Sequence, residues 1–323
     1  MTGSLLQLSG IVIDLVHRVD HMPLAGEEVE TPDVLVTAGG GFNAMIAARN
    51  FGVAVSYAGI IGTGLFANMV RSKLDEANIP GIISRKPKQD QGTCIVVVDR
   101  GGERSFISYH GAERQLEKAD YAAVIPSQDD WLLLTGYSLF KTESARVLSP
   151  WLDQLKPGPM FLFDPGPTVA DIPQDRLHSA MVRADWVSAN RAEAKVLTGE
   201  TDPAFAVRDL CKGRAGAIVR SGAQGCWIAT PSNGVEFISA FAVDAVDTNG
   251  AGDCHAGAFI AASILGHVPD QAAMLANASA AISTTRHGPA TAPYLSEITS
   301  FIESRGPSLV GEPVKLKPIN RRN

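Results

Sequence analysis

Strand-like and helix-like segments alternate along residues 131–220, and this rhythm constrains the fold more than any other feature of the chain. Short apolar runs such as WLLLTG (131–136) and MFLFDPG (160–166) flank an amphipathic stretch, ESARVLSPWLDQL (143–155). Parallel strands need a crossover long enough to hold a helix, so this order predicts βαβ units. The expected fold is α/β, with a central, mostly parallel sheet and helices on both faces.

Two segments depart from this rhythm. TCIVVVDRGGERSFISYHG (93–111) has two strand-like runs joined by a glycine turn, which is typical of a hairpin appended to the main sheet. We expect it to form a small β lid, built from about residues 14–38 and 92–110. The first apolar run, LLQLSGIVIDLV (5–16), is predicted to be one strand.

The bulk properties exclude several classes of protein. The 323 residues fit one large domain, expected over residues 1–303, and residues 304–323 are expected to be a loosely held, proline-containing basic tail. A net charge of −6 argues against nucleic acid or an anionic membrane as the main partner. No apolar stretch approaches the roughly 18 residues of a membrane span. With four cysteines and no CxxC pair, we expect a reduced, cytoplasmic setting and no structural zinc site.

The segment DTNGAGD (247–253) is the clearest candidate for chemistry. Small residues before a helix leave backbone N–H groups open to an anion, and the helix dipole favours negative charge there. A carboxylate such as Asp253 would repel a phosphate, but it could take the proton of a hydroxyl that attacks the phosphate. The alternative is that Asp253 only caps the helix.

Two motifs resemble those of a known family. DTNGAGDCHAGAF (247–259) closely resembles the C-terminal signature of the ribokinase-like (PfkB) carbohydrate kinases, and TAGGGFNAMIAARNFG (37–52) resembles their N-terminal signature, with Ala38 where glycine is usual. Weaker matches follow in the family's order over roughly residues 5 to 293. The resemblance implies a ribokinase-like fold and transfer of the γ-phosphoryl group of ATP, with Mg²⁺ and possible K⁺ activation, to the terminal CH₂OH of a small sugar. A nucleoside is the alternative acceptor, and a homodimer formed through the lid is implied.

The resemblance also implies roles for the residues of the catalytic and substrate sites. Asp253 would be the catalytic base, and the backbone N–H groups of Gly250, Ala251, Gly252 and Asp253 would form the anion hole. Asp14, Gly39, Gly40 and Asn43 would contact the sugar. Specificity would depend on lid side chains. Phe106, Tyr109 and His110 of the hairpin could pack on a ring, or they could simply form the core of the lid.

Further roles concern the nucleotide and the cations. Asn190 would organise nucleotide phosphate, Gly222 and Gly225 would line the nucleotide, and Asn277 would lie in the helix that covers the adenine. Glu193 would act indirectly on Mg²⁺, and Asp247 with Asn249 would hold a monovalent cation.

Several of these residues have structural alternatives. Asn190 with Glu193 is also a good capping box, and Asn43 could be a simple N-cap. Gly222 and Gly225 could serve only a hairpin, and Asp14 could be an acid in a turn at the end of a strand.

Two rival functions remain open at this point. Gly62, Gly64 and Ala67 fit the G-x-G-x-x-A fingerprint of a dinucleotide site, which would indicate an NADP-binding oxidoreductase. That reading leaves DTNGAGD unexplained. A non-catalytic sugar sensor would need neither Asp253 nor the small-residue turn.

Overall fold

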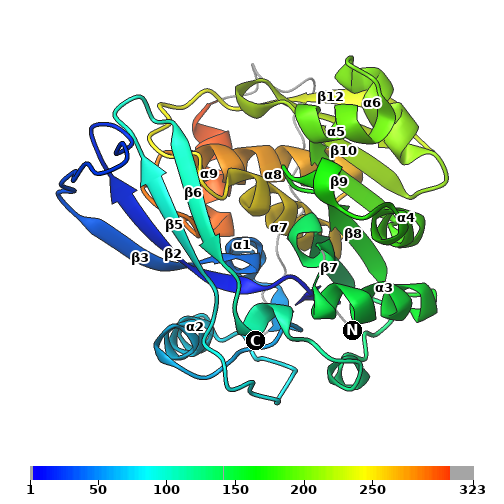
Figure 1. Cartoon of the computed structure of the whole chain (residues 1–323). Coiled ribbons are helices and arrows are strands. Elements are labelled where there is room, and N and C mark those ends of the chain that lie inside the picture. Colours follow the sequence, from blue (N-terminus) through cyan, green and yellow to red (C-terminus); the bar gives the residue numbers. More distant parts are fainter. Residues whose placement is uncertain (1–2, 141, 306–323) are drawn as a thin grey trace, which may run out of the picture.

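The computed structural model describes residues 3–140 and 142–305, and these form a central sheet, a separate lid sheet and the surrounding helices (Figure 1). In spatial order the central sheet contains β12 (Gly234–Ser239), β11 (Gly225–Thr230), β10 (Gly216–Arg220), β9 (Trp186–Asn190), β8 (Met160–Asp164), β7 (Trp131–Thr135), β1 (Ser4–Gln7) and β4 (Ala54–Tyr57). The strands from β4 to β10 are parallel, and β11 and β12 continue the sheet antiparallel. The expected α/β fold with a mostly parallel sheet is confirmed.

Helices cover both faces of this sheet because successive strand residues point to opposite sides. Trp131 and Leu133 pack in one core layer, and Leu132 and Leu134 pack in the other. The first layer takes α1 (Gly41–Asn50), α2 (Leu65–Glu76), α7 (Ala251–Ile264), α8 (Pro269–Thr284) and α9 (Leu295–Ser304). The second takes α3 (Glu143–Gln154), α4 (Gln174–Arg183), α5 (Arg191–Thr198) and α6 (Pro203–Cys211).

The lid is a second sheet, in which β3 (Val34–Gly40), β2 (Ile11–Arg18), β5 (Thr93–Val98) and β6 (Arg104–Tyr109) lie side by side in that order. Its strands come from two parts of the chain, one before α1 and one after α2 (Figure 1). Both segments expected to build the lid therefore do so.

One expectation about elements was wrong, and one helix was missed. The run 5–16 is not one strand, because residues 8–10 separate β1 of the central sheet from β2 of the lid. Asp14 therefore lies inside a lid strand rather than at the end of a strand. The C-terminal helix α9 was not expected at all. The predicted tail lies almost wholly outside the described residues, which end at 305.

Among the helices of the described ranges, none is both long and apolar enough to cross a membrane.

Candidate active site

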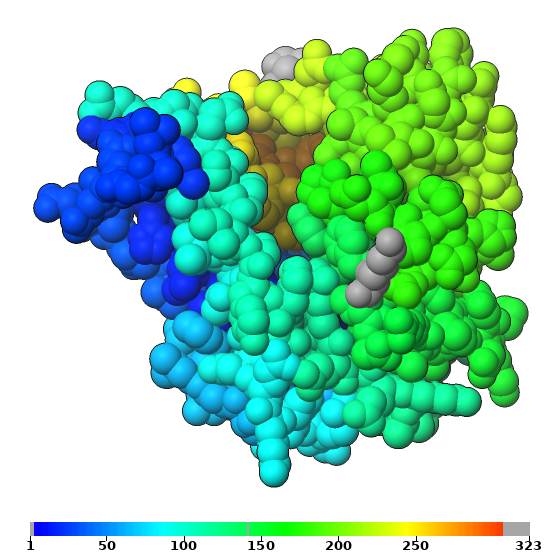
Figure 2. All heavy atoms as spheres, in the orientation of Figure 1, coloured from blue at the N-terminus to red at the C-terminus, as the bar shows by residue number. Residues whose placement is uncertain are grey.

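A hollow lies between the lid and the central sheet, and helices α7 and α8 form its floor (Figure 2). Strands β8, β9 and β10 end with Asp164, Asn190 and Arg220, respectively. Because parallel strands end at the same edge of a sheet, polar side chains from three strands gather there. Ligands of open α/β sheets bind at this edge, and the predicted site residues lie around it.

The N-terminus of α7 has the geometry of an anion site. Gly250 caps it with a left-handed φ of 73°, a conformation that favours glycine, and no side chain caps the helix. The Ala251 N–H donates to the Thr248 carbonyl at 3.3 Å. The N–H groups of Gly252 and Asp253 donate to no acceptor in the part of the chain that the structure describes. Two amides at the positive end of the helix dipole are therefore open to a ligand.

Asp253 lies in the first turn of α7 and does not cap the helix, so the capping alternative has no support. Its Oδ2 accepts a hydrogen bond from Nδ2 of Asn43 at 3.0 Å. Burial raises the pKa of Asp253 to about 6, with a contribution from Asp164, while Asn43 and Arg220 oppose the rise. A carboxylate with a pKa near neutrality is well matched to proton abstraction.

Asn43 reaches Asp253 from α1, and it is not the N-cap of that helix, because α1 begins at Gly41 and Gly40 occupies the cap. Its Oδ1 is buried and has no hydrogen-bond partner among the described residues. The amide thus orients Asp253 through one end and leaves an acceptor at the other.

Asp14 approaches Asp253 from the lid. Burial, together with the negative charge of Asp253, raises the pKa of Asp14 to about 7. A Cβ on Gly39 of the neighbouring strand β3 would lie 2.1 Å from Oδ2 of Asp14, so only a glycine leaves room for the carboxylate there. No hydrogen bond from the described ranges reaches the Asp14 carboxylate. It is therefore available to a ligand.

A second polar group surrounds Arg220. Its Nη1 donates to Oδ2 of Asp164 at 2.7 Å and to Oγ of Ser188 at 2.6 Å, and its Nη2 lies 3.6 Å from Oε2 of Glu193. A Cβ on Gly252 would lie 3.5 Å from Nη2 of Arg220, so this cation also borders the α7 turn. Asp164 and Ser188 were missed from the sequence, and Arg220 has no assigned role there. Their shared signal was their place at or near the ends of consecutive parallel strands.

Asn190 and Glu193 form a complete capping box at the start of α5. Oε2 of Glu193 accepts from the Asn190 N–H at 2.7 Å, and the Glu193 N–H donates to Oδ1 of Asn190 at 2.9 Å. Burial raises the pKa of Glu193 to about 6, with a further rise from Asp164. The structural alternative is present in full, and the proximity to Arg220 adds an electrostatic connection to the turn.

The remaining nucleotide residues lie farther along the same edge. Gly222 and Gly225 flank the turn between the antiparallel strands β10 and β11, so the hairpin alternative is present as well. Asn277 donates from Nδ2 to the Ile238 carbonyl at 3.0 Å, and its Oδ1 lies 3.2 Å from Nε2 of His255. Asn277 thereby ties α8 to the end of β12 and to α7.

Asp247 and Asn249 are brought together as expected, since Oδ1 of Asp247 accepts from the Asn249 N–H at 2.9 Å. The same carboxylate is paired with two arginines of the lid, Arg104 and Arg18, which the sequence did not indicate.

The dinucleotide fingerprint is explained by a local contact. Asp90 fills the N-terminus of α2, where its oxygens accept from the N–H groups of Phe66 at 3.1 Å and Ala67 at 2.7 Å. A pyrophosphate would need these amides, so Gly62, Gly64 and Ala67 do not form a dinucleotide site here.

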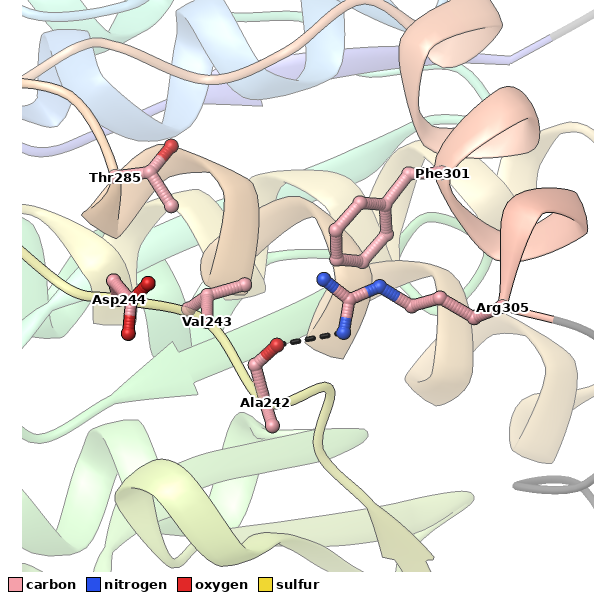
Figure 3. Close-up of a pocket in the computed structure, with 6 residues that line it drawn as sticks. All are labelled: Ala242, Val243, Asp244, Thr285, Phe301 and Arg305. Carbon is pink, nitrogen blue, oxygen red and sulfur yellow. Dashed lines mark hydrogen bonds between the residues drawn. The ribbon is translucent and has the colours of Figure 1, made fainter.

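A further surface pocket lies between the segment 242–244 and α9 (Figure 3). Arg305 lines it, stacks 4.1 Å above the centre of the Phe301 ring and donates to the Ala242 carbonyl at 2.6 Å. None of the predicted site residues lines this pocket.

Comparison with known proteins decides the family. Residues 5–295 match the pfkB family carbohydrate kinase model. The chain belongs to the pfkB family of carbohydrate kinases. This kinase is 30% identical to YegV, an uncharacterized sugar kinase of Escherichia coli K12, over 91% of this chain and 92% of the relative. The predicted membership and the predicted class of enzyme, a phosphotransferase with an alcohol group as acceptor, are confirmed.

Solved structures agree on the fold of this kinase. The ribokinase of Thermotoga maritima superimposes with a TM-score of 0.80 at 25% identity, covering 93% of this chain and 99% of the other. The Arabidopsis thaliana ribokinase complexed with ribose and ATP gives a TM-score of 0.75 at 19% identity, covering 94% and 99%.

Proposed function

We propose that this kinase transfers the γ-phosphoryl group of ATP to the terminal CH₂OH of a small sugar that carries a vicinal diol. The observation that carries the proposal is the convergence of two carboxylates, Asp14 and Asp253, beside the open amides of α7. Asp253 would take the proton of the attacking hydroxyl as the new O–P bond forms and the bond between the γ-phosphorus and the bridging oxygen breaks. ADP leaves with the bridging oxygen, and the amides of Gly252 and Asp253 stabilise the charge on the transferred group.

Asp14 would select the acceptor. A buried carboxylate with no protein partner can accept hydrogen bonds from two adjacent hydroxyls, which makes a vicinal diol its natural ligand. The Arabidopsis ribokinase complexed with ribose and ATP has the same fold, and we propose a furanose or a short open-chain sugar as the acceptor of this kinase. A screen for ADP release over sugars, keto-sugar acids and nucleosides tests the proposal. The absence of acceptor-dependent ADP release from every compound would reject it.

A nucleoside is the second candidate, and one lid residue favours it. In the lid sheet Asp14 pairs with Cys94, and Cys94 pairs with Ser108, so these three residues share one face of the sheet. Side chains alternate along β6, so Phe106, two residues before Ser108, lies on this same face. Phe106 is exposed and could stack on a base. Tyr109 lies on the opposite face, where its hydroxyl accepts a hydrogen bond from Gln89, and it does not support this reading.

Magnesium is the proposed metal, and it would neutralise charge on the nucleotide phosphates. Both oxygens of Glu193 already accept hydrogen bonds from Asn190, which fits an indirect contact through water rather than direct ligation. The described residues contain no cluster of three or more His, Cys, Asp or Glu side chains suited to holding a metal ion alone. Oxygens of the nucleotide phosphates would therefore supply part of the coordination of the ion.

Changing Glu193 to glutamine separates these roles. The amide oxygen can still accept the Asn190 N–H, which keeps the helix cap, but the amide nitrogen then faces the donor Nδ2 of Asn190. One hydrogen bond is lost, and the melting temperature is expected to fall slightly. The loss of charge is expected to raise the Mg²⁺ concentration for half-maximal rate and to lower kcat. A magnesium titration of both proteins, with Glu200→Gln in the following loop as control, measures this. An unchanged magnesium dependence would leave Glu193 as a capping residue only.

The family resemblance predicts a potassium ion beside Asp247 and Asn249, and the two arginines at the Asp247 carboxylate argue against a strong requirement for it. Because Arg104 and Arg18 already supply positive charge at the Asp247 carboxylate, we expect the wild-type rate to respond only slightly to potassium.

A homodimer through the lid is part of the proposal. Val34, Val36, Ile107 and Tyr109 are apolar side chains exposed on the lid strands, and burying them in a second copy would remove apolar surface from water. Light scattering during size-exclusion chromatography would give twice the mass of the chain, and Ile107→Glu is expected to shift it towards the monomer. A monomeric wild-type protein would contradict this expectation.

A further inference from the structure

The carboxylate of Asp247 is surrounded by donors from three directions. Its Oδ1 accepts from the Asn249 N–H at 2.9 Å and from Nη2 of Arg104 at 2.7 Å, and its Oδ2 accepts from the Gly288 N–H at 3.0 Å. Nη2 of Arg18 lies 3.7 Å from Oδ2. The side chain of Asp247 is only 8% exposed, so these contacts replace nearly all of its hydration. Both arginines belong to the lid, whereas Asp247 belongs to the segment that leads into α7.

Arg104 contacts two consecutive residues of that segment. Besides its bond to Asp247, its Nη1 donates to Oγ1 of Thr248 at 3.0 Å. The two bonds leave from different nitrogens of one planar guanidinium, a geometry that the single ammonium nitrogen of a lysine does not match. The Thr248 carbonyl in turn accepts from the Ala251 N–H. A short chain of contacts therefore connects the lid to the first residue of α7.

The charge of Asp247 makes this contact consequential for the turn. Burial opposes its ionisation, but the amides of Asn249 and Gly288 and the guanidinium of Arg104 hold its pKa below the usual range. An uncompensated carboxylate would repel phosphate at the nearby amides of Gly252 and Asp253. The guanidinium removes that repulsion and fixes the segment at the same time.

We propose that Arg104 is a positioning residue: its guanidinium holds Asp247 and Thr248 and supplies, from the lid, the positive charge that the family resemblance assigns to a monovalent cation. The inference rests on the proposed phosphoryl transfer at the α7 turn. It makes the geometry of that turn depend on the position of the lid, because the ion pair joins the two. It also predicts that the wild-type enzyme needs no added potassium.

The test compares Arg104→Ala and Arg104→Lys with the wild type and with Arg100→Ala. Arg100 is the matched control. It lies at the tip of the same hairpin, pairs with Asp20, and has a side chain that is 78% exposed. Rates are measured in potassium chloride and in tetramethylammonium chloride at equal ionic strength, each with and without low-millimolar guanidinium. We expect Arg104→Ala to lose about 10- to 100-fold in kcat in tetramethylammonium, the scale of a misplaced reacting group. Potassium or guanidinium should restore part of that loss.

The wild type, Arg100→Ala and Arg104→Lys test the inference further. Wild type and Arg100→Ala are expected to run at equal rates in the two salts, and Arg104→Lys should fall between wild type and Arg104→Ala. An Arg104→Ala protein with wild-type kcat, or one whose loss neither cation relieves, would overturn the proposal. Strong activation of the wild type by potassium would also overturn it.

A readout without an acceptor keeps this test separate from the proposed function. The melting temperature of Arg104→Ala is expected to rise in potassium or low-millimolar guanidinium relative to tetramethylammonium, while that of the wild type stays constant. If no acceptor is phosphorylated but this difference appears, the proposed function fails and the role of Arg104 at Asp247 stands. If activity is present and no cation raises the melting temperature or the rate of the variant, the role of Arg104 fails alone.

Discussion

Replacing Asp253 with asparagine is expected to lower kcat by about 10²–10⁴-fold, the usual contribution of a general base. The amide cannot take the proton of the acceptor hydroxyl, but its oxygen can still accept the hydrogen bond from Asn43, so the side chain keeps its place. The KM for ATP is expected to change little. Steady-state kinetics with the best acceptor from the screen measure both parameters.

Two observations check the interpretation. Asp244→Asn makes the same change on an exposed position of the preceding segment, and it should leave kcat unaltered. In the wild type, kcat/KM should fall as the pH drops below about 7, because Asp14, with a pKa raised to about 7, and Asp253, with a pKa raised to about 6, both work only when ionised. An Asp253→Asn enzyme with near-normal turnover would remove Asp253 from the chemistry.

Replacing Asp14 with alanine is expected to weaken kcat/KM for the true acceptor by about 2–4 kcal/mol, because the hydroxyls it binds would be buried without partners. The fold should tolerate the change. Burial raises the pKa of Asp14 to about 7, so its ionised form is disfavoured in the folded state and contributes no stability above that pH. The melting temperature at pH 8 is therefore expected to stay constant or to rise.

A deoxy acceptor identifies what Asp14 recognises. The matching 2-deoxy compound should be a poor substrate for the wild type and should lose little more in Asp14→Ala. Asp20→Ala, an exposed change elsewhere in the lid, should affect neither acceptor. Equal penalties on the diol and deoxy compounds in Asp14→Ala would show that Asp14 does not bind the diol.

The fold was predictable because each strand and helix leaves a pattern within its own short stretch of sequence. The alternation over residues 131–220 reflects strand length and helix periodicity, and both survive in the structure. The division of residues 5–16 between two sheets was not predictable in this way. A strand pattern records which residues are apolar, but it does not record which sheet they join, and only three residues, Leu8–Gly10, separate β1 from β2.

The site was predictable where its residues lie within one motif, as in the segment 247–253. It was not predictable where residues distant in sequence combine. Arg220 meets Asp164, 56 positions away, and Arg104 meets Asp247, 143 positions away. No short sequence motif spans such distances, because both contacts depend on how distant segments are arranged in the fold.

The placement of the two carboxylates has a consequence for how such enzymes diversify. Asp253 sits on α7, a helix whose residues from Cys254 to Ala262 are all buried, so substitutions around it disturb the core and are rarely tolerated. Asp14 sits on a lid whose side chains are largely exposed along β3 and β6, where most substitutions cost little stability. Mutation can therefore explore new acceptors in the lid while the phosphoryl chemistry is inherited intact from the core.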